Sequence, residues 1–434
     1  DTAWSTFQGR SSQPDYSASP QYAVIPLSEN QDFSVLSGGS GGDGSSDGSA
    51  DGSSDGSSDG SSDGSADGSS DGSADGSSDG SADGSSDGDG DGDPEGDSVY
   101  LNSLTPGYWY QPAGTMMADV APDITPVGTN NETAVVSAWG GAALDTDKNR
   151  MIVWGGGHRD YGGNEIYTFD LDNLEWTLLT DPTPNDQIVV TEESETYQDG
   201  NPVSRHTYDG LAYIPSDGCL FSQGGSRYSS GYSTKATWKY CFGDQQWEQL
   251  ADAPDAKFGV STAYDPVSEK VIVRTKYYIS EYDPVANSYR TLYHHQAGFW
   301  WDQSTAAIAP DRRQMIIIGG PQSQYGAEFG VFDLETYNYW TPTFTGDTEI
   351  MDAIAPGVAY DSTNDRVVAW SGGSDVYILD LNTWDWERVA ISGDEAPGNA
   401  QSTGTFGRFQ YSEKYDVFVL INSANQDVYF LKLD

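Results

Sequence analysis

The chain has 434 residues and a formal net charge of −47, with 67 Asp and Glu against 20 Lys and Arg. This excess of acid excludes nucleic-acid binding through phosphate neutralisation, which needs clustered Lys and Arg. No apolar run reaches the roughly 18 residues that a membrane-spanning helix needs, so no membrane span is predicted.

Residues 1–36 contain two short runs that favour β-strands, QYAVIPL and DFSVL, joined by a polar turn. Each run is too small to fold alone. We therefore expect this tail to need a partner, either as an anchor or by adding strands to the sheet of another molecule. Self-assembly through residues 1–36 would display the rest of the chain from a filament or matrix.

Residues 37–97 form a low-complexity segment in which Asp recurs at every fourth position from Asp43 to Asp87, in DGSS and DGSA units. No residue there can build a hydrophobic core, so the segment is predicted to be a solvated, self-repelling linker. Residues 43–97 carry 16 Asp, one Glu and no Lys or Arg, which leaves a net charge of −30 on the rest of the chain.

The end of this linker partly matches a calcium-binding loop. Asp87, Asp89 and Asp91 fit the opening D-x-D-x-D-G pattern, but the twelfth position is Ser98 rather than the bidentate Glu. Calcium, bound weakly, is therefore the one cofactor that the sequence suggests, and the predicted fold requires none.

The remaining residues, 98–434, repeat one pattern: an apolar run, a glycine pair, a variable loop, an aromatic strand ending in Asp, and a closing aromatic residue. One copy reads RMIVWGGGHRDYGGNEIYTFDLDNLEWTLL, residues 150–179. The closing aromatics are Trp176, Trp247, Tyr289, Trp340 and Trp386. A repeat of about 40 to 50 residues with strand content is typical of propeller blades.

A sixth unit ends at Asp434 after three strands and has no closing aromatic. The missing strand is predicted around Trp109, in the segment PGYWYQPAG, which has no local strand to pair with. Pairing of this N-terminal strand with the last unit would close the ring and remove two exposed sheet edges. The sequence therefore predicts an all-β fold, a six-bladed β-propeller over residues 98–434.

These units resemble the kelch repeat, the blade type also found in the central domain of galactose oxidase. The glycine pairs that carry the resemblance are Gly156–Gly157, Gly224–Gly225, Gly319–Gly320 and Gly372–Gly373, while the third unit has Arg274–Thr275 and the sixth Ile421–Asn422. The resemblance implies the propeller fold. It does not extend to oxidase chemistry, because nothing in the chain matches the tyrosine and cysteine copper site of that enzyme.

The two cysteines fall in the second blade. Cys219 is predicted to begin its second strand and Cys241 to end its third. These ends face each other in an antiparallel pair, so a disulfide is expected, and the alternative is two buried free thiols. A disulfide fits a secreted protein, as does a chain that begins at Asp1 without Met.

In a four-stranded antiparallel blade, the loops between second and third strands and the connections between blades emerge at one mouth of the channel. The segments GGGHRDYGGN and SRHTYDG bring His158, Asp160, Arg205, His206 and Tyr208 to this mouth. Alternation along a strand would turn His206 and Tyr208 to the same side. The other residues expected to bind ligand there are Trp139, Tyr161, Asn164, Arg227, Tyr228, His295, Trp300, Trp301 and Arg408.

Exposed aromatic rings suit stacking on sugars, and Arg suits carboxylate or sulfate groups through its planar set of donors. The predicted ligand is therefore an acidic or sulfated polysaccharide, such as a surface glycan. The alternative for each of these residues is a purely structural role, because Arg and Asp often pair to fix propeller turns and Trp side chains pack between blades.

His158, His206, Tyr208 and Arg205 also form the set needed for β-elimination from a uronic acid. Arg neutralises the carboxylate, one group removes the C5 proton, and another protonates the leaving oxygen. The set is similar to that of propeller-type ulvan lyases, which implies polysaccharide lyase activity as a further alternative. A zinc site at His158, Asp160 and His206 is weaker, because no HxH or HxxxH spacing exists.

The sequence thus supports two hypotheses of different kinds. The first is a secreted or cell-surface propeller that binds a polysaccharide and is either catalytic or not. The second is a structural subunit of a surface filament or matrix, in which the N-terminal tail assembles and displays the propeller.

Overall fold

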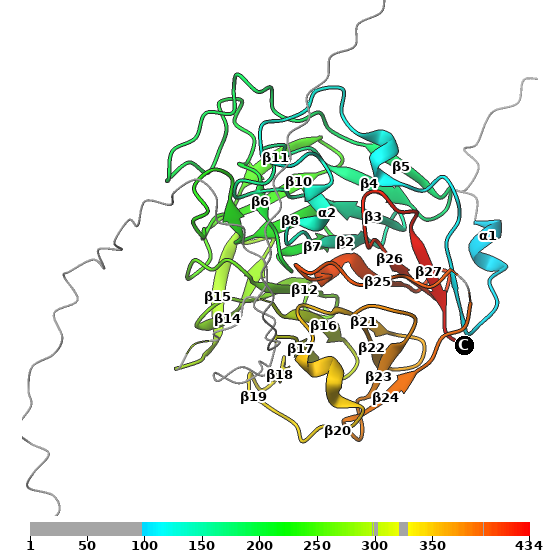
Figure 1. Ribbon diagram of the computed structural model, residues 1–434. Helices are drawn as coiled ribbons and strands as arrows, with labels where there is room; N and C mark the ends of the chain where they lie inside the picture. The colour runs from blue at the N-terminus through cyan, green and yellow to red at the C-terminus, as the bar shows by residue number, and fades with distance from the viewer. Residues whose placement is uncertain (1–97, 297, 299–302, 321–328, 394) are drawn as a thin grey trace, which may run out of the picture. The chain divides into compact units, whose positions relative to one another are not determined.

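A computed structural model describes residues 98–434, except 297, 299–302, 321–328 and 394. The described residues belong to one unit, Asp87–Asp434. They contain six antiparallel sheets of four strands, one with an additional short parallel strand, which confirms the six-bladed β-propeller (Figure 1). The N-terminal tail, the linker, and Asp87, Asp89 and Asp91 of the calcium prediction lie outside the described residues.

The six blades follow one another along the chain. From the channel outward, the first blade consists of β2 (Ala142–Asp145), β3 (Arg150–Val153), β4 (Tyr167–Asp170) and β5 (Glu175–Leu178). The second consists of β7 (Leu211–Ile214), β8 (Cys219–Gln223), β10 (Thr237–Cys241) and β11 (Gln246–Gln249). The third consists of β12 (Ser261–Asp265), β13 (Lys270–Arg274), β14 (Tyr278–Asp283) and β15 (Ser288–His294). The fourth is β16 (Thr305–Ala309), β17 (Gln314–Ile318), β18 (Gly330–Asp333) and β19 (Tyr339–Trp340).

The fifth blade is β21 (Gly357–Asp361), β22 (Arg366–Trp370), β23 (Val376–Asp380) and β24 (Asp385–Val389), with β20 (Thr345–Gly346) added in parallel at its edge. The sixth is β25 (Phe409–Ser412), β26 (Val417–Leu420), β27 (Tyr429–Lys432) and β1 (Tyr108–Tyr110). A separate pair is formed by β6 (Arg205–His206) and β9 (Ser226–Arg227). The connections hold the short helices α1 (Val99–Asn102) and α2 (Ala134–Ser137) and the 3-10 helices η1 (Met117–Val120), η2 (Thr348–Asp352) and η3 (Phe406–Arg408).

The Asp that ends each repeated aromatic strand has a local structural cause. The carboxylate of Asp170 accepts hydrogen bonds from the backbone N–H groups of Asp172 and Asn173, at 2.7 and 3.0 Å. Asp333 makes the same turn in blade four. An acidic side chain at this position satisfies donors that the turn leaves open, so the repeat fixes its own third-to-fourth-strand turn.

The hydrophobic core lies between adjacent sheets, since each blade is apolar on both faces. Ile152 and Trp154 of blade one, for example, pack with Leu211 and Leu220 of blade two. The innermost strands β2, β7, β12, β16, β21 and β25 contact one another in this order around the channel. No blade buries its own faces, so the ring must close for any blade to be fully packed.

The closing strand lies where the sequence predicts it. In β1, Trp109 is paired with Leu431 of β27, the antiparallel register that joins the two ends of the ring. The Trp109 side chain is buried, and its indole Nε1 donates to the carbonyl oxygen of Ser374 in blade five at 2.8 Å. This residue therefore completes blade six and also ties it to blade five.

The predicted disulfide is present. Cys219 and Cys241 are direct partners across β8 and β10, and their sulfur atoms are bonded at 2.03 Å. The alternative of two free thiols is excluded. Over the described ranges, no helix is long and apolar enough to cross a membrane.

Candidate functional site

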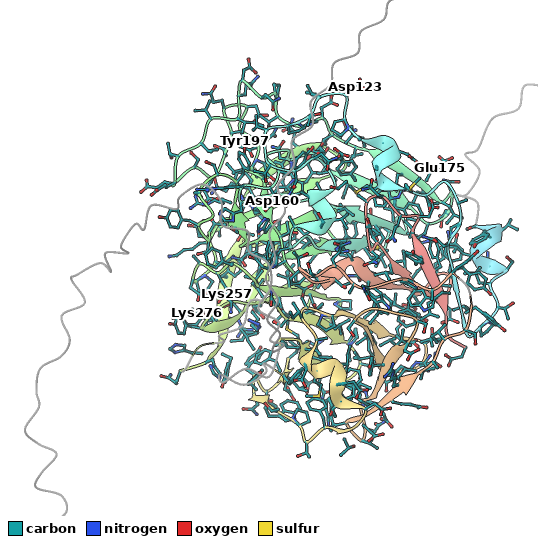
Figure 2. The ribbon with its side chains drawn as sticks, viewed as in Figure 1. Asp123, Asp160, Glu175, Tyr197, Lys257 and Lys276 are labelled. Atoms are coloured by element: carbon teal, nitrogen blue, oxygen red, sulfur yellow. A yellow bond between two sulfur atoms is a disulfide. The ribbon has the colours of Figure 1, made fainter. Side chains whose placement is uncertain are left out.

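Five of the predicted residues, from three connections, meet at one mouth of the channel. We call Trp139, His158, Asp160, His206 and Tyr208 the mouth cluster. The His206 ring lies 4.9 Å from the Trp139 ring, 5.9 Å from His158 and 6.2 Å from Tyr208, measured between centroids. His206 Nε2 is 2.8 Å from Asp160 Oδ2. Figure 2 labels Asp160, which lies beside the strand labelled β6 in Figure 1.

Glycine allows the loop of His158 to lie directly against β6. Gly157 has φ +62°, and a Cβ there would stand 2.0 Å from the backbone nitrogen of His206. The loop is held from its other side by Asn130, whose side-chain amide donates to Asp160 Oδ1 at 3.0 Å and whose N–H donates to the Asp160 carbonyl at 2.8 Å. The GGGHRDYGGN motif thus positions Asp160 against His206 before any ligand arrives.

The electrostatics of the mouth cluster differ from those of isolated side chains. Partial desolvation by the surrounding loops, with the neighbouring His206, lowers the pKa of His158 below its ordinary 6.5, so its imidazole is neutral at pH 7. The hydrogen bond from His206 lowers the pKa of Asp160, which is therefore a carboxylate. His158 and the adjacent Arg159 are exposed, Trp139 is half-buried, and His206 is buried beneath them. A ligand would meet the imidazole, the guanidinium and the indole first.

Trp139 and Tyr208 of the mouth cluster also pack with residues at the starts of two other innermost strands. Trp139, Tyr208, Ala355 and Phe406 each stand just before an innermost strand, have φ between +40° and +52°, and pack together as a channel plug. Tyr208 N donates to the Trp139 carbonyl at 2.7 Å. The Tyr208 ring lies 6.2 Å from that of His206, but strand alternation is not the cause, because β6 ends at His206 and Tyr208 adopts the left-handed conformation.

Three of the arginines that the sequence places at the mouth, Arg205, Arg227 and Arg408, are inside the protein. Arg205 is fully buried, donates to the carbonyls of Val203 and Gly224, and lies over the Trp154 ring. Arg227 donates to Glu195 Oε1 at 2.9 Å. Arg205, Arg227 and Arg408 are therefore buried, whereas Arg159, beside the mouth cluster, is exposed.

Arg408 is also fully buried, and its guanidinium is bonded to backbone oxygens. Nε donates to the Gly140 carbonyl at 2.9 Å, and the terminal nitrogens donate to the carbonyls of Ile421 and Gly404. Burial lowers the pKa of Arg408 to about 9, which still leaves it charged at neutral pH. It joins the start of blade one to blade six and does not reach the surface of the mouth.

The other predicted ligand-binding residues are dispersed. Tyr161 is buried and donates to Glu165 Oε1 at 2.6 Å, and buried Asn164 donates to the Pro202 carbonyl. Tyr228 is half-buried near the mouth cluster, and its backbone N–H donates to the Ser204 carbonyl. His295 packs against Tyr293 and Tyr339 at the outer edges of blades three and four. Trp300 and Trp301 lie outside the described residues.

Metal binding gains no support from this arrangement. Within the described part of the chain, no group of three His, Cys, Asp or Glu side chains is arranged to hold a metal ion. His158, Asp160 and His206 do approach one another, but His206 Nε2 and Asp160 Oδ2 are hydrogen-bonded to each other. These two atoms are therefore already occupied as possible metal ligands.

A second feature of the channel was not predicted. Beyond the plug, a cavity of about 800 Å³ is lined by small inner-strand residues such as Ala143, Ala212 and Ala359, with Asp209 at its inner end. Asp209 Oδ2 accepts from the N–H of Ala306 in blade four, and burial raises the pKa of Asp209 well above its usual value. An alanine in the first strand of each of the first five blades was the available sequence signal.

No family model matches the chain, and no curated protein matches it.

Proposed function

We propose that the protein is an extracellular propeller that binds an acidic or sulfated polysaccharide at the mouth cluster. The observation that carries the proposal is the half-buried Trp139 ring, which packs against the His206 ring at a tilt, with exposed His158 and Arg159 beside it. An indole face offers a platform for a sugar ring, and a guanidinium offers paired donors for a carboxylate or sulfate.

The charge of the protein supports a specific site over general adhesion. Outside the linker the chain carries a net charge of −30, which repels polyanions from most of its surface. The accessible Arg159 is a local positive charge on this mainly negative surface. The disulfide between Cys219 and Cys241 is in keeping with an oxidising extracellular compartment.

The first test removes the stacking platform. Trp139→Ala should weaken binding of sulfated and uronate polysaccharides by roughly 2- to 12-fold, since aromatic ring pairs contribute about 0.5–1.5 kcal/mol. Affinity electrophoresis and calorimetry would measure this. Trp384→Ala is the control, because Trp384 is also half-buried but lies in the turn between β23 and β24, at the opposite end of the blades.

Arg159→Ala should reduce affinity and make the remaining binding less sensitive to salt, since an exposed ion pair is screened. Equal binding by the parent and by both mouth variants would remove the mouth cluster as the site.

A second candidate function is polysaccharide lyase activity, which the 2.8 Å contact between His206 and Asp160 favours. In β-elimination His158 would take the C5 proton, the C4–O bond would break as the C4=C5 double bond forms, and the hydroxyl of Tyr208 would give its proton to the leaving oxygen. Arg159 is the accessible group for neutralising the uronate.

The lyase reading predicts a characteristic pH dependence. His158 must be neutral to accept a proton, and its pKa is lowered, so activity should persist below pH 6.5 and fall only as the pH drops through the lowered value. The readout is the ultraviolet absorbance of an unsaturated uronate. His158→Gln should abolish it and His294→Gln should not, because His294 stacks on Tyr278 at the edge of blade three. No absorbance across a broad panel of uronate polymers would leave binding as the function.

A further inference from the structure

A second cavity lies outside the ring of channel strands, between blades one and two. We call it the outer cavity: it encloses about 420 Å³ and is lined by Tyr240 and Trp247 together with Asp181, Asp199, Asn201 and Gln246. One wall is the outer strand β11, and the other is the long connection from β5 to β6. Figure 2 labels Tyr197, which belongs to that connection. A volume of this size is within the range of small-ligand sites.

Trp247 is more exposed than two of the closing aromatics at equivalent positions. Trp176 is 8% exposed and donates its indole N–H to the Thr115 carbonyl, and Trp386 is 1% exposed. Trp247 closes blade two in the same way, paired with Tyr240, but it is only partly buried and faces the outer cavity. Its ring is held by Trp154 at 4.8 Å and Tyr240 at 5.4 Å. The propeller therefore presents a rigid, partly open indole at this edge.

The polar wall opposite Trp247 is built before any ligand binds. Asp199 accepts hydrogen bonds from the Thr183 hydroxyl at 2.6 Å and from the Asn201 amide at 2.9 Å. The backbone N–H of Asn201 donates to the other Asp199 oxygen at 2.9 Å. These bonds hold planar amide and carboxylate groups in place, which lowers the entropic cost of ordering them around a ligand.

The charge of the outer cavity determines which sugars suit it. Its lining includes Asp181 and Asp199 and, among the described residues, no Lys or Arg. Carboxylates would repel uronate or sulfate groups, while they and the amides accept hydrogen bonds from neutral hydroxyls. An indole face with planar hydrogen-bonding side chains at its rim is suited to a pyranose ring, which is apolar on its faces and polar at its edge.

We propose that the outer cavity is a binding subsite for a neutral sugar residue, separate from the mouth cluster. Trp247 stacks on the face of the sugar, and Gln246, Asn201 and Asp181 bond its hydroxyls. The site takes neutral glycans and rejects anionic ones, which is the opposite preference to that proposed for the mouth.

The test uses the full-length protein and a panel of neutral di- and trisaccharides of glucose, galactose, mannose and xylose. Saturation-transfer NMR should detect binding of at least one member, with little dependence on salt. Gln246→Ala should weaken that binding by about 2- to 10-fold, the value of one or two hydrogen bonds. Trp247→Phe, which keeps an aromatic packed on Trp154, should weaken it further.

Gln249→Ala is the matched control, since Gln249 is exposed on the same strand but does not line the cavity. It should bind neutral sugars like the parent protein, and so should Trp139→Ala. Absence of binding by the whole panel, or equal binding by the parent and both cavity variants, would overturn the outer site. Failure of the mouth proposal would instead be seen with polyanions and the Trp139 variant, so the two failures are distinguishable.

Discussion

Trp109→Ala should destabilise the whole propeller by about 3–5 kcal/mol, the cost of removing a fully packed aromatic from a core. Trp109 is buried against Trp370, Ile391 and Phe418, and its indole bonds the Ser374 carbonyl at 2.8 Å. The mutation would leave a cavity at the seam of the ring and an unsatisfied carbonyl. Because no blade is covered until the ring closes, the loss should appear in the global unfolding transition, measured by urea and by heat.

Tyr108→Ala provides the control on the same strand, since Tyr108 is 43% exposed and points away from this core. It should change the free energy of unfolding far less. An internal deletion of residues 98–112 removes β1 entirely and should leave the edge of β27 unpaired, so that the protein unfolds or aggregates. A folded monomer after this deletion would contradict the role of β1 as the closing strand.

Arg408→Met should cost about 3–5 kcal/mol of stability and should not change the ligand affinity of the molecules that remain folded. The buried guanidinium donates to the carbonyls of Gly140, Gly404 and Ile421, and each would lose its donor in a site that water does not reach. Calorimetric unfolding and polysaccharide binding, measured on the same preparation, separate the two effects.

Arg388→Met is the comparison for this substitution. Arg388 pairs with Asp375 and Glu349 on the surface, where solvent screens the interaction, so its loss should have little effect on unfolding. If Arg408→Met instead kept the stability of the parent and lost polysaccharide binding, Arg408 would have to be placed in the ligand site.

The blade number, the closing strand and the disulfide could all be predicted from the sequence because their causes are local. A strand that ends in Asp makes its own turn, as the bonds from Asp172 and Asn173 to Asp170 show. A closing aromatic then marks the outer strand of each unit. Because the sixth unit lacks its outer strand, the segment around Trp109 was the candidate for the closing strand. Antiparallel pairing of the second and third strands placed Cys219 opposite Cys241.

The gathering of His158, Asp160 and His206 could also be predicted, since meander topology sends their loops to the same mouth. Which arginine is exposed at the mouth could not be predicted. Arg159 and Arg205 both stand next to a histidine in the sequence, yet Arg159 is exposed and Arg205 is fully buried. The difference arises because β6 pairs with β9 and turns Arg205 onto Trp154 of the neighbouring blade.

The channel plug and the outer cavity depend on tertiary structure for the same reason. Nothing in the sequence indicates that Trp139, Tyr208 and Phe406 pack together, because they come into contact only when closure of the ring brings the starts of three blades together. In the sequence Trp247 cannot be distinguished from the other closing aromatics, and it lines a cavity only because the connection from β5 to β6 folds beside it. Local hydrogen bonds and strand periodicity are encoded in short segments, so the sequence by itself determined the repeat, whereas exposure depends on neighbours distant in the chain and was decided only by the packed ring.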